Sequence, residues 1–91
     1  MQQAIEQKLK KYFELTSLAL KKVKIVENHR KQAEDILDLS KRYFDDAKFF
    51  EKKGDLINAY GAVVYAHAFL DVGARLNFFD VGKDNKLFMV D

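Results

Sequence analysis

Two long helical patterns meet at Gly54-Asp55 with almost no loop between them, and this junction constrains the fold more than any other feature of the sequence. Glycine readily closes a helix in the left-handed conformation, and aspartate is a favoured N-cap of the helix that follows. We therefore expect one helix over residues 29–53 and the next over residues 56–78. Because so short a connection reverses the chain at once, these two helices must pack antiparallel.

A third helical pattern precedes this hairpin. Over residues 3–23, large apolar residues recur at steps of three and four and therefore share one helical face: Ile5, Leu9, Tyr12, Phe13, Leu20 and Val23. The β-branched run after it predicts an extended connection over residues 24–27, with Asn28 as the N-cap of the next helix.

The composition agrees with these helices. The 91 residues include no proline and only four glycines, which suits uninterrupted helices, and they are enough for one domain. We expect an all-α fold: a three-helix antiparallel bundle that forms a single domain over residues 1–91, with a tight hairpin between its second and third helices. An irregular tail over residues 79–91 completes the chain.

The helix expected over residues 56–78 is apolar on two sides. No Asp, Glu, Lys or Arg occurs from residue 56 to residue 70. Opposite the core face lies a second apolar stripe: Tyr65, Phe69, Val72 and Leu76. A helix that is apolar all round must be covered all round, either by the apolar tail segment 87–90 or by a second copy of the chain in a homodimer. Gly61 and Gly73 interrupt this helix and predict close packing against it.

One set of polar residues could carry chemistry. His67, Asp71 and Arg75 are spaced four residues apart and therefore line up along the same helix. The functional interpretation is a proton-transfer or anion-binding site, and the structural one is a polar rib beside the core. We prefer the structural interpretation, because a lone histidine on an apolar face is usually satisfied by its neighbours.

No other pattern suggests catalysis. The chain has two histidines, His29 and His67, and neither has another potential metal ligand at a familiar spacing. The four glycines are scattered singly, so no phosphate-binding loop is expected. We therefore predict no catalytic residue, no metal and no cofactor, and we expect that the protein is not an enzyme.

Positive charge is concentrated at the start of the chain. Residues 1–31 carry eight Lys or Arg against three Glu, although the net charge of the whole chain is only +2. Such a basic flank could contact the phosphates of a nucleic acid, but no aromatic side chains are interleaved for base stacking. A solvated helix face is the preferred interpretation. The candidate anion-binding residues are Lys10, Lys11, Lys21 and Lys22.

Cysteine is absent, which fits a reducing cytoplasm. The first residues lack the apolar core of a signal peptide, and no apolar run is long enough to span a bilayer. We expect a cytoplasmic protein with no membrane partner.

Part of the sequence resembles a known family. Aromatic, small and polar residues recur in two runs: Tyr43-Phe44-x-Asp46-Ala47-x-x-Phe50-x-x-x-Gly54-Asp55 and Tyr65-Ala66-His67-x-x-x-Asp71-x-Gly73-Ala74-Arg75-Leu76. Over residues 33–78 they resemble the archaeal domain-of-unknown-function family 357. The resemblance implies a short helical-bundle protein of the archaeal cytoplasm, without an assigned activity. Asn77 departs from the pattern, since a glycine would commonly close the third helix there.

These observations favour a non-enzymatic module for self-association or for contact with another protein, through the stripe from Tyr65 to Leu76. A nucleic-acid-associated accessory protein that uses the basic flank is the alternative. A ligand-binding or hydrolytic site around His67, Asp71 and Arg75 is the second alternative.

Overall fold

The turn at Gly54 joins two long helices of the structure, a computed structural model that describes residues 2–90. The ends of the predicted domain, residues 1 and 91, lie outside this range. Helix α2 (Arg30–Lys52) is followed by Gly54, whose φ of 76° is left-handed, and α3 (Leu56–Arg75) begins two residues after this glycine. Asp55 caps α3, because its carboxylate accepts hydrogen bonds from the backbone N–H of Asn58 (3.2 Å) and from its side-chain amide (2.7 Å). The predicted hairpin is confirmed.

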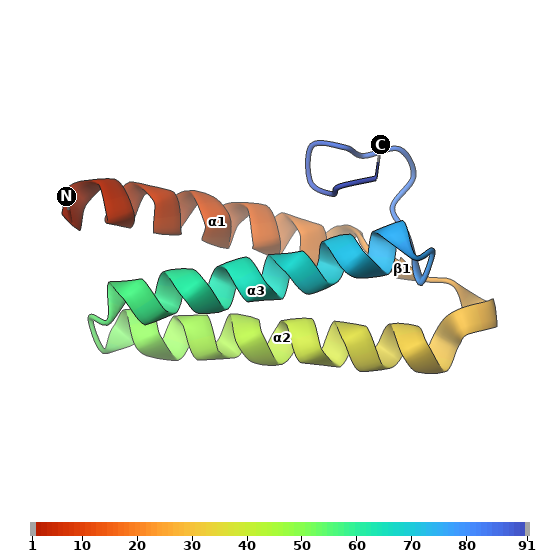
Figure 1. The fold of residues 1–91 in the computed structure, drawn as a ribbon, viewed down its shortest axis with the longest axis horizontal. Helices are drawn as coiled ribbons and strands as arrows, with labels where there is room; N and C mark the ends of the chain where they lie inside the picture. The colour runs from red at the N-terminus through yellow and green to blue at the C-terminus, as the bar shows by residue number, and fades with distance from the viewer. Residues whose placement is uncertain (1, 91) are drawn as a thin grey trace.

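Helix α3 is the central element of the fold. It packs against α2 on one side and against α1 (Gln2–Lys22) on the other (Figure 1). Successive helices run in opposite directions, so α1 and α3 are parallel neighbours. The three-helix all-α bundle predicted from the sequence is therefore confirmed.

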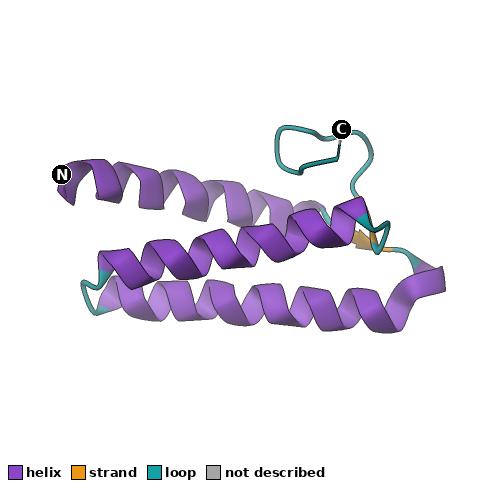
Figure 2. Cartoon of the chain, in the orientation of Figure 1, coloured by secondary structure: helices purple, strands orange, loops and turns teal. Residues whose placement is uncertain are grey.

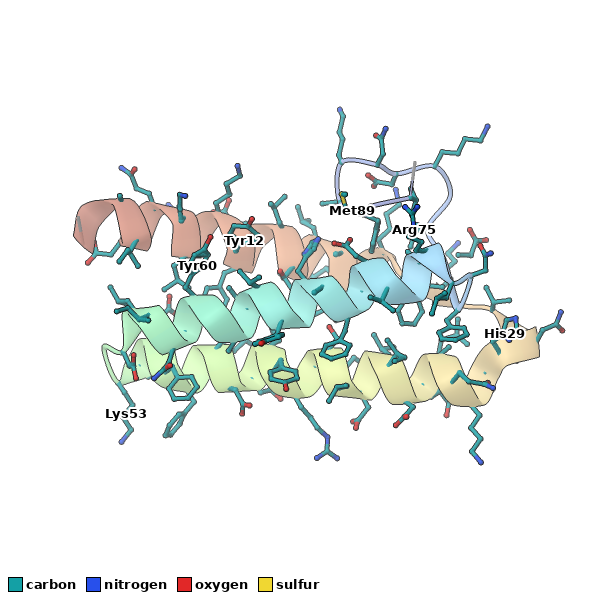
Figure 3. The ribbon with its side chains drawn as sticks, viewed as in Figure 1. Tyr12, His29, Lys53, Tyr60, Arg75 and Met89 are labelled. Atoms are coloured by element: carbon teal, nitrogen blue, oxygen red, sulfur yellow. The ribbon has the colours of Figure 1, made fainter. Side chains whose placement is uncertain are left out.

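Small residues and aromatic rings make these helix contacts. Between α2 and α3, the buried Ser40 hydroxyl donates a 2.7 Å hydrogen bond to the carbonyl of Ala66. Between α1 and α3, the rings of Tyr12 and Tyr60 pack with their centroids 5.5 Å apart (Figure 3). A ring on α1 also reaches a ring on α2, since Phe13 packs edge-on against Phe44.

A two-stranded ribbon closes the end of the bundle away from the hairpin. Strand β1 (Lys24–Ile25) pairs antiparallel with β2 (Phe79–Asp80), both at the same end in Figure 2. The predicted extended connection therefore exists, but residues 27–29 form a 3-10 helix, η1 (Glu27–His29). The prediction of Asn28 as an N-cap is wrong: His29 occupies that position and makes no side-chain capping bond.

Helix α3 ends at Arg75, three residues before the predicted end. Asn77 adopts a left-handed φ of 63°, the conformation that a glycine would otherwise supply. The backbone N–H of Phe78 then donates to the carbonyl of Gly73 (2.8 Å), which closes the helix. The chain turns into β2 at this point, so the left-handed residue sets the end of α3.

Gly73 confirms one of the two packing predictions for glycine. A Cβ at this position would collide with the ring of Phe79, with the ring carbon Cδ2 only 2.5 Å away. Gly61 differs, because nothing in the chain lies within 4 Å of the place where its Cβ would be. Close packing at Gly61 is therefore absent within the described residues of this chain.

The tail after β2 folds back onto the bundle. Its Phe88 is only 2% exposed and joins a core cluster with Ala19 of α1, Leu70 of α3 and Phe79 of β2. A 3.0 Å ion pair between Lys22 of α1 and Asp84 pins the turn of the tail. Over residues 2–90, none of the helices combines the length and apolarity needed to cross a membrane.

Candidate functional site

The tail docks on the side of α3 that faces α1. The Nε2–H of His67 donates a 2.7 Å hydrogen bond to the carbonyl of Leu87, and Nδ1 accepts one from the Thr16 hydroxyl at 3.0 Å. A carbonyl oxygen can only accept, so Nε2 must carry a proton, and in the neutral imidazole Nδ1 is then the acceptor. A second contact lies one turn further along α3: the backbone N–H of Met89, which is labelled in Figure 3, donates a hydrogen bond to Oδ1 of Asp71 at 3.1 Å.

The structure brings together two members of the predicted polar rib. His67 and Asp71 lie side by side, with Nε2 and Oδ1 3.8 Å apart, and both hold the tail. Arg75 is exposed and makes no ion pair with Asp71 among the described residues. Both ring nitrogens of His67 are already engaged and its side chain is only 14% exposed. In this arrangement His67 and Asp71 act as a latch for the tail.

The side of α3 that faces away from the core remains exposed. Along this side, five apolar side chains keep between 38% and 75% of their surface in contact with solvent: Ile57, Val64, Tyr65, Val72 and Leu76. Gly61 and Ala68 lie between them and are also exposed. We call these seven residues the outer face of α3. None of the seven is charged, and they extend over about 29 Å on the helix rise of 1.5 Å per residue; the exposed Arg75 lies in the same arc, at the C-terminal end.

The outer face overlaps with the predicted stripe but is not identical to it. Tyr65, Val72 and Leu76 are on the outer face, whereas Phe69 is half-buried because its ring stacks on Tyr43 of α2 at 5.7 Å. Sequence reasoning missed Ile57 and Val64. A sequence signal for these two residues exists: Ile57, Gly61 and Val64 follow one another at steps of four and three. They therefore share one side of the helix, opposite the buried alanines of α3.

The apolar surface continues onto α2. Tyr43 stacks on Phe69 and its ring also lies 5.4 Å from that of Tyr65, so it borders the outer face. Leu39 lies one turn earlier on the same side of α2 and is 36% exposed. The candidate interaction surface thus spans two helices.

The four lysines predicted as an anion site form two pairs on neighbouring sides of α1. All four are exposed, but Lys10 and Lys21 project to one side of α1, and Lys11 and Lys22 project about 100° away. Lys22 is also engaged by Asp84. This ion pair, together with backbone N–H donors, holds the pKa of the Asp84 carboxyl below its usual value of 3.8.

Metal binding finds no support in the geometry of residues 2–90. No three carboxylate, imidazole or thiolate side chains in this range lie close enough together to hold an ion. The acidic residues of α2 are spread along its solvent side and include Asp38, which pairs with Arg42 at 2.8 Å. Two features of the structure remain as candidates for function: the tail bound to His67 and Asp71, and the exposed outer face of α3.

Comparison with known proteins identifies a family. Neither the curated proteins nor the solved structures contain a match to this chain. A family model described as "Protein of unknown function (DUF357)" matches residues 11–79, which is more than half of the chain and includes all of α2 and α3. The chain therefore belongs to the DUF357 family, whose function is unknown.

Proposed function

We propose that this protein is a non-enzymatic self-association module that forms a homodimer through the outer face of α3. The observation that carries the proposal is the position of the tail. The apolar segment that could have covered α3 is latched to His67 and Asp71 on the α1 side, and the outer face is left bare. Of the covers that the sequence suggests, a second copy of the chain and another protein remain, and the helix packing and charge described below favour a second copy.

The exposed area is large enough for a weak, specific dimer. The five half-exposed side chains of the outer face, with Leu39 beside them, present on the order of 500 Å² per protomer. Two copies would then bury roughly 1,000 Å², the lower limit for a specific interface. We therefore expect a dissociation constant in the micromolar range rather than an obligate dimer.

Gly61 supports a close approach of two helices. A glycine within an exposed helix costs about 1 kcal/mol relative to alanine, and no neighbour among the described residues of this chain requires it. Gly61 and Ala68 are the smallest residues of the outer face and let a partner backbone come near between the larger side chains. A second copy of α3 would fit over them.

Charge favours an antiparallel pair. Arg75 is the charged residue closest to the outer face, and parallel copies about a two-fold axis would place it against its own copy. In an antiparallel pair centred on Tyr65, Arg75 reaches the opposite end of the partner helix. Asp55 lies there, because both residues are ten positions from Tyr65. The two arginines are then about 30 Å apart along the helix axis.

Light scattering coupled to size exclusion tests the proposal at chain concentrations from about 10 to 500 µM. We expect the mass to rise from that of the monomer towards twice that value, and we expect Val64→Glu combined with Val72→Glu to keep the chain monomeric. Leu18→Glu is the matched control, since Leu18 is a 53% exposed apolar residue of α1 away from this face. Circular dichroism verifies that each variant is folded. A wild-type chain that stays monomeric at 500 µM would overturn the proposal.

The orientation is tested separately with a spin label on a single cysteine, because the chain has none of its own. A label at Asn58→Cys should give a distance of about 20 Å in the antiparallel pair and about 10 Å in a parallel pair.

A further inference from the structure

A hollow lies between the end of α1, strand β1 and the turn of the tail. It is open to solvent, its volume is about 570 Å³, and its lining comes from segments nearly sixty residues apart. Six of its nine lining residues are charged: Lys22, Lys24, Lys83, Lys86, Asp80 and Asp84. The docked tail therefore adds two lysines to the basic end of α1.

Both carboxylates of the hollow are already used to shape it. Asp84 binds Lys22 through Oδ2 at 3.0 Å, and its Oδ1 accepts from the backbone N–H groups of Lys86 and Leu87 at 3.1 Å each. Asp80 accepts from the backbone N–H of Gly82 at 3.0 Å. These contacts hold the turn in place, so the aspartates serve as internal supports.

The remaining lysines have no such partner in the part of the chain that the structure describes. Lys24, Lys83 and Lys86 are exposed and form no ion pair with any of the residues 2–90. With four lysines and two aspartates, the lining has a surplus of two positive charges. Four lysines around one hollow raise the positive potential there, and a bound anion would offset it.

We propose that this hollow binds the phosphate group of a small phosphorylated molecule. A phosphate monoester carries nearly two negative charges at neutral pH, which matches the surplus of the lining. The volume lies within the range of small-molecule sites, and lysine ammonium groups are common phosphate ligands. A nucleic acid strand fits less well, because no aromatic side chain lines the hollow to stack on a base.

The test is a titration of the ¹⁵N-labelled chain with inorganic phosphate and with pyrophosphate, followed by amide chemical shifts. We expect saturable shifts at Gly82, Lys83 and Lys86. Lys83→Gln combined with Lys86→Gln should weaken binding at least tenfold. Lys10→Gln combined with Lys21→Gln removes the same charge from the other side of α1 and should change binding less than twofold. Lys22 is left intact because it supports the tail through Asp84.

Three results would overturn the proposal. The first is the absence of saturable shifts up to about 20 mM of either anion. The second is equal weakening by the two double variants, which would show that only net charge matters. The third is tight, salt-sensitive binding of a single-stranded RNA oligonucleotide that pyrophosphate does not displace, which would assign the lysines to a nucleic acid.

Discussion

Replacing Gly73 with alanine tests the packing at the end of α3 directly. The new Cβ would lie 2.5 Å from Cδ2 and 3.0 Å from Cζ of the Phe79 ring, whereas ordinary contacts begin near 3.4 Å. The ring must therefore move by about 1 Å. It has little freedom to do so, because Phe79 is 2% exposed and its backbone is paired with Ile25 in the ribbon.

The expected loss follows from two opposing effects. Alanine in place of glycine within a helix gains about 0.5–1 kcal/mol, and forcing extra volume into a packed core costs about 1–3 kcal/mol. We place the Gly73→Ala variant in the upper part of that range, with a net loss of about 1–2 kcal/mol in the free energy of unfolding. For a chain of this size the urea midpoint should fall by on the order of 1 M.

Gly61→Ala is the internal control, since it makes the same change in the same helix at a position with open space. It should stabilise the monomer by about 0.5–1 kcal/mol. Urea unfolding followed by circular dichroism at 222 nm, at a few micromolar chain, measures both variants without interference from association. If Gly73→Ala were as stable as the wild type, the packing of Phe79 against α3 described above would be incorrect.

Three further predictions concern the tail and the helix cap. Phe88→Ala should cost about 3 kcal/mol in the free energy of unfolding, because the ring is almost fully buried; urea unfolding measures it, and a loss below 1 kcal/mol would contradict the docked tail. Asp55→Ala should cost about 1 kcal/mol by removing the cap of α3, and Asp55→Asn, which can still accept from Asn58, should restore most of it in the same assay. The Lys22 ammonium lowers the pKa of Asp84 from 3.8, so the stabilisation from this pair is present above pH 3.8 and disappears as the pH falls through the lower pKa of the folded state. Acid titrations of stability should show this loss in the wild type and not in Asp84→Asn; an unchanged acid limb in the variant would refute it.

The helical part of the fold was predictable because its signals are local. Gly54 and Asp55 mark the hairpin by their backbone and capping preferences alone, and the apolar periodicity of α2 needs no partner to be recognised. The end of α3 was misplaced because Asn77, which has a side chain, adopts a conformation more typical of glycine. Only the downstream packing of Phe78 and Phe79 makes that choice favourable.

The candidate sites depended on contacts that the sequence does not reveal. The sequence does not predict which side of α3 the tail covers. Leu87 and Met89 bind His67 and Asp71 through backbone groups, which every residue has and which carry no sequence signal. For the same reason Lys83 and Lys86 were not associated with the lysines of α1. The pairing of β1 with β2 could not be predicted either, because strands of two residues are too short to show the alternating apolar pattern of a β-strand.

The central position of α3 also implies an order of folding. Its contacts with α2 join residues near in sequence, so the hairpin closes with the smallest loss of chain entropy. Helix α1 can then dock on a preformed surface, while Phe88 and its neighbours enter a cavity whose walls belong to both α1 and α3. We therefore expect tail residues to exchange their amide hydrogens first, through an opening that leaves the hairpin intact.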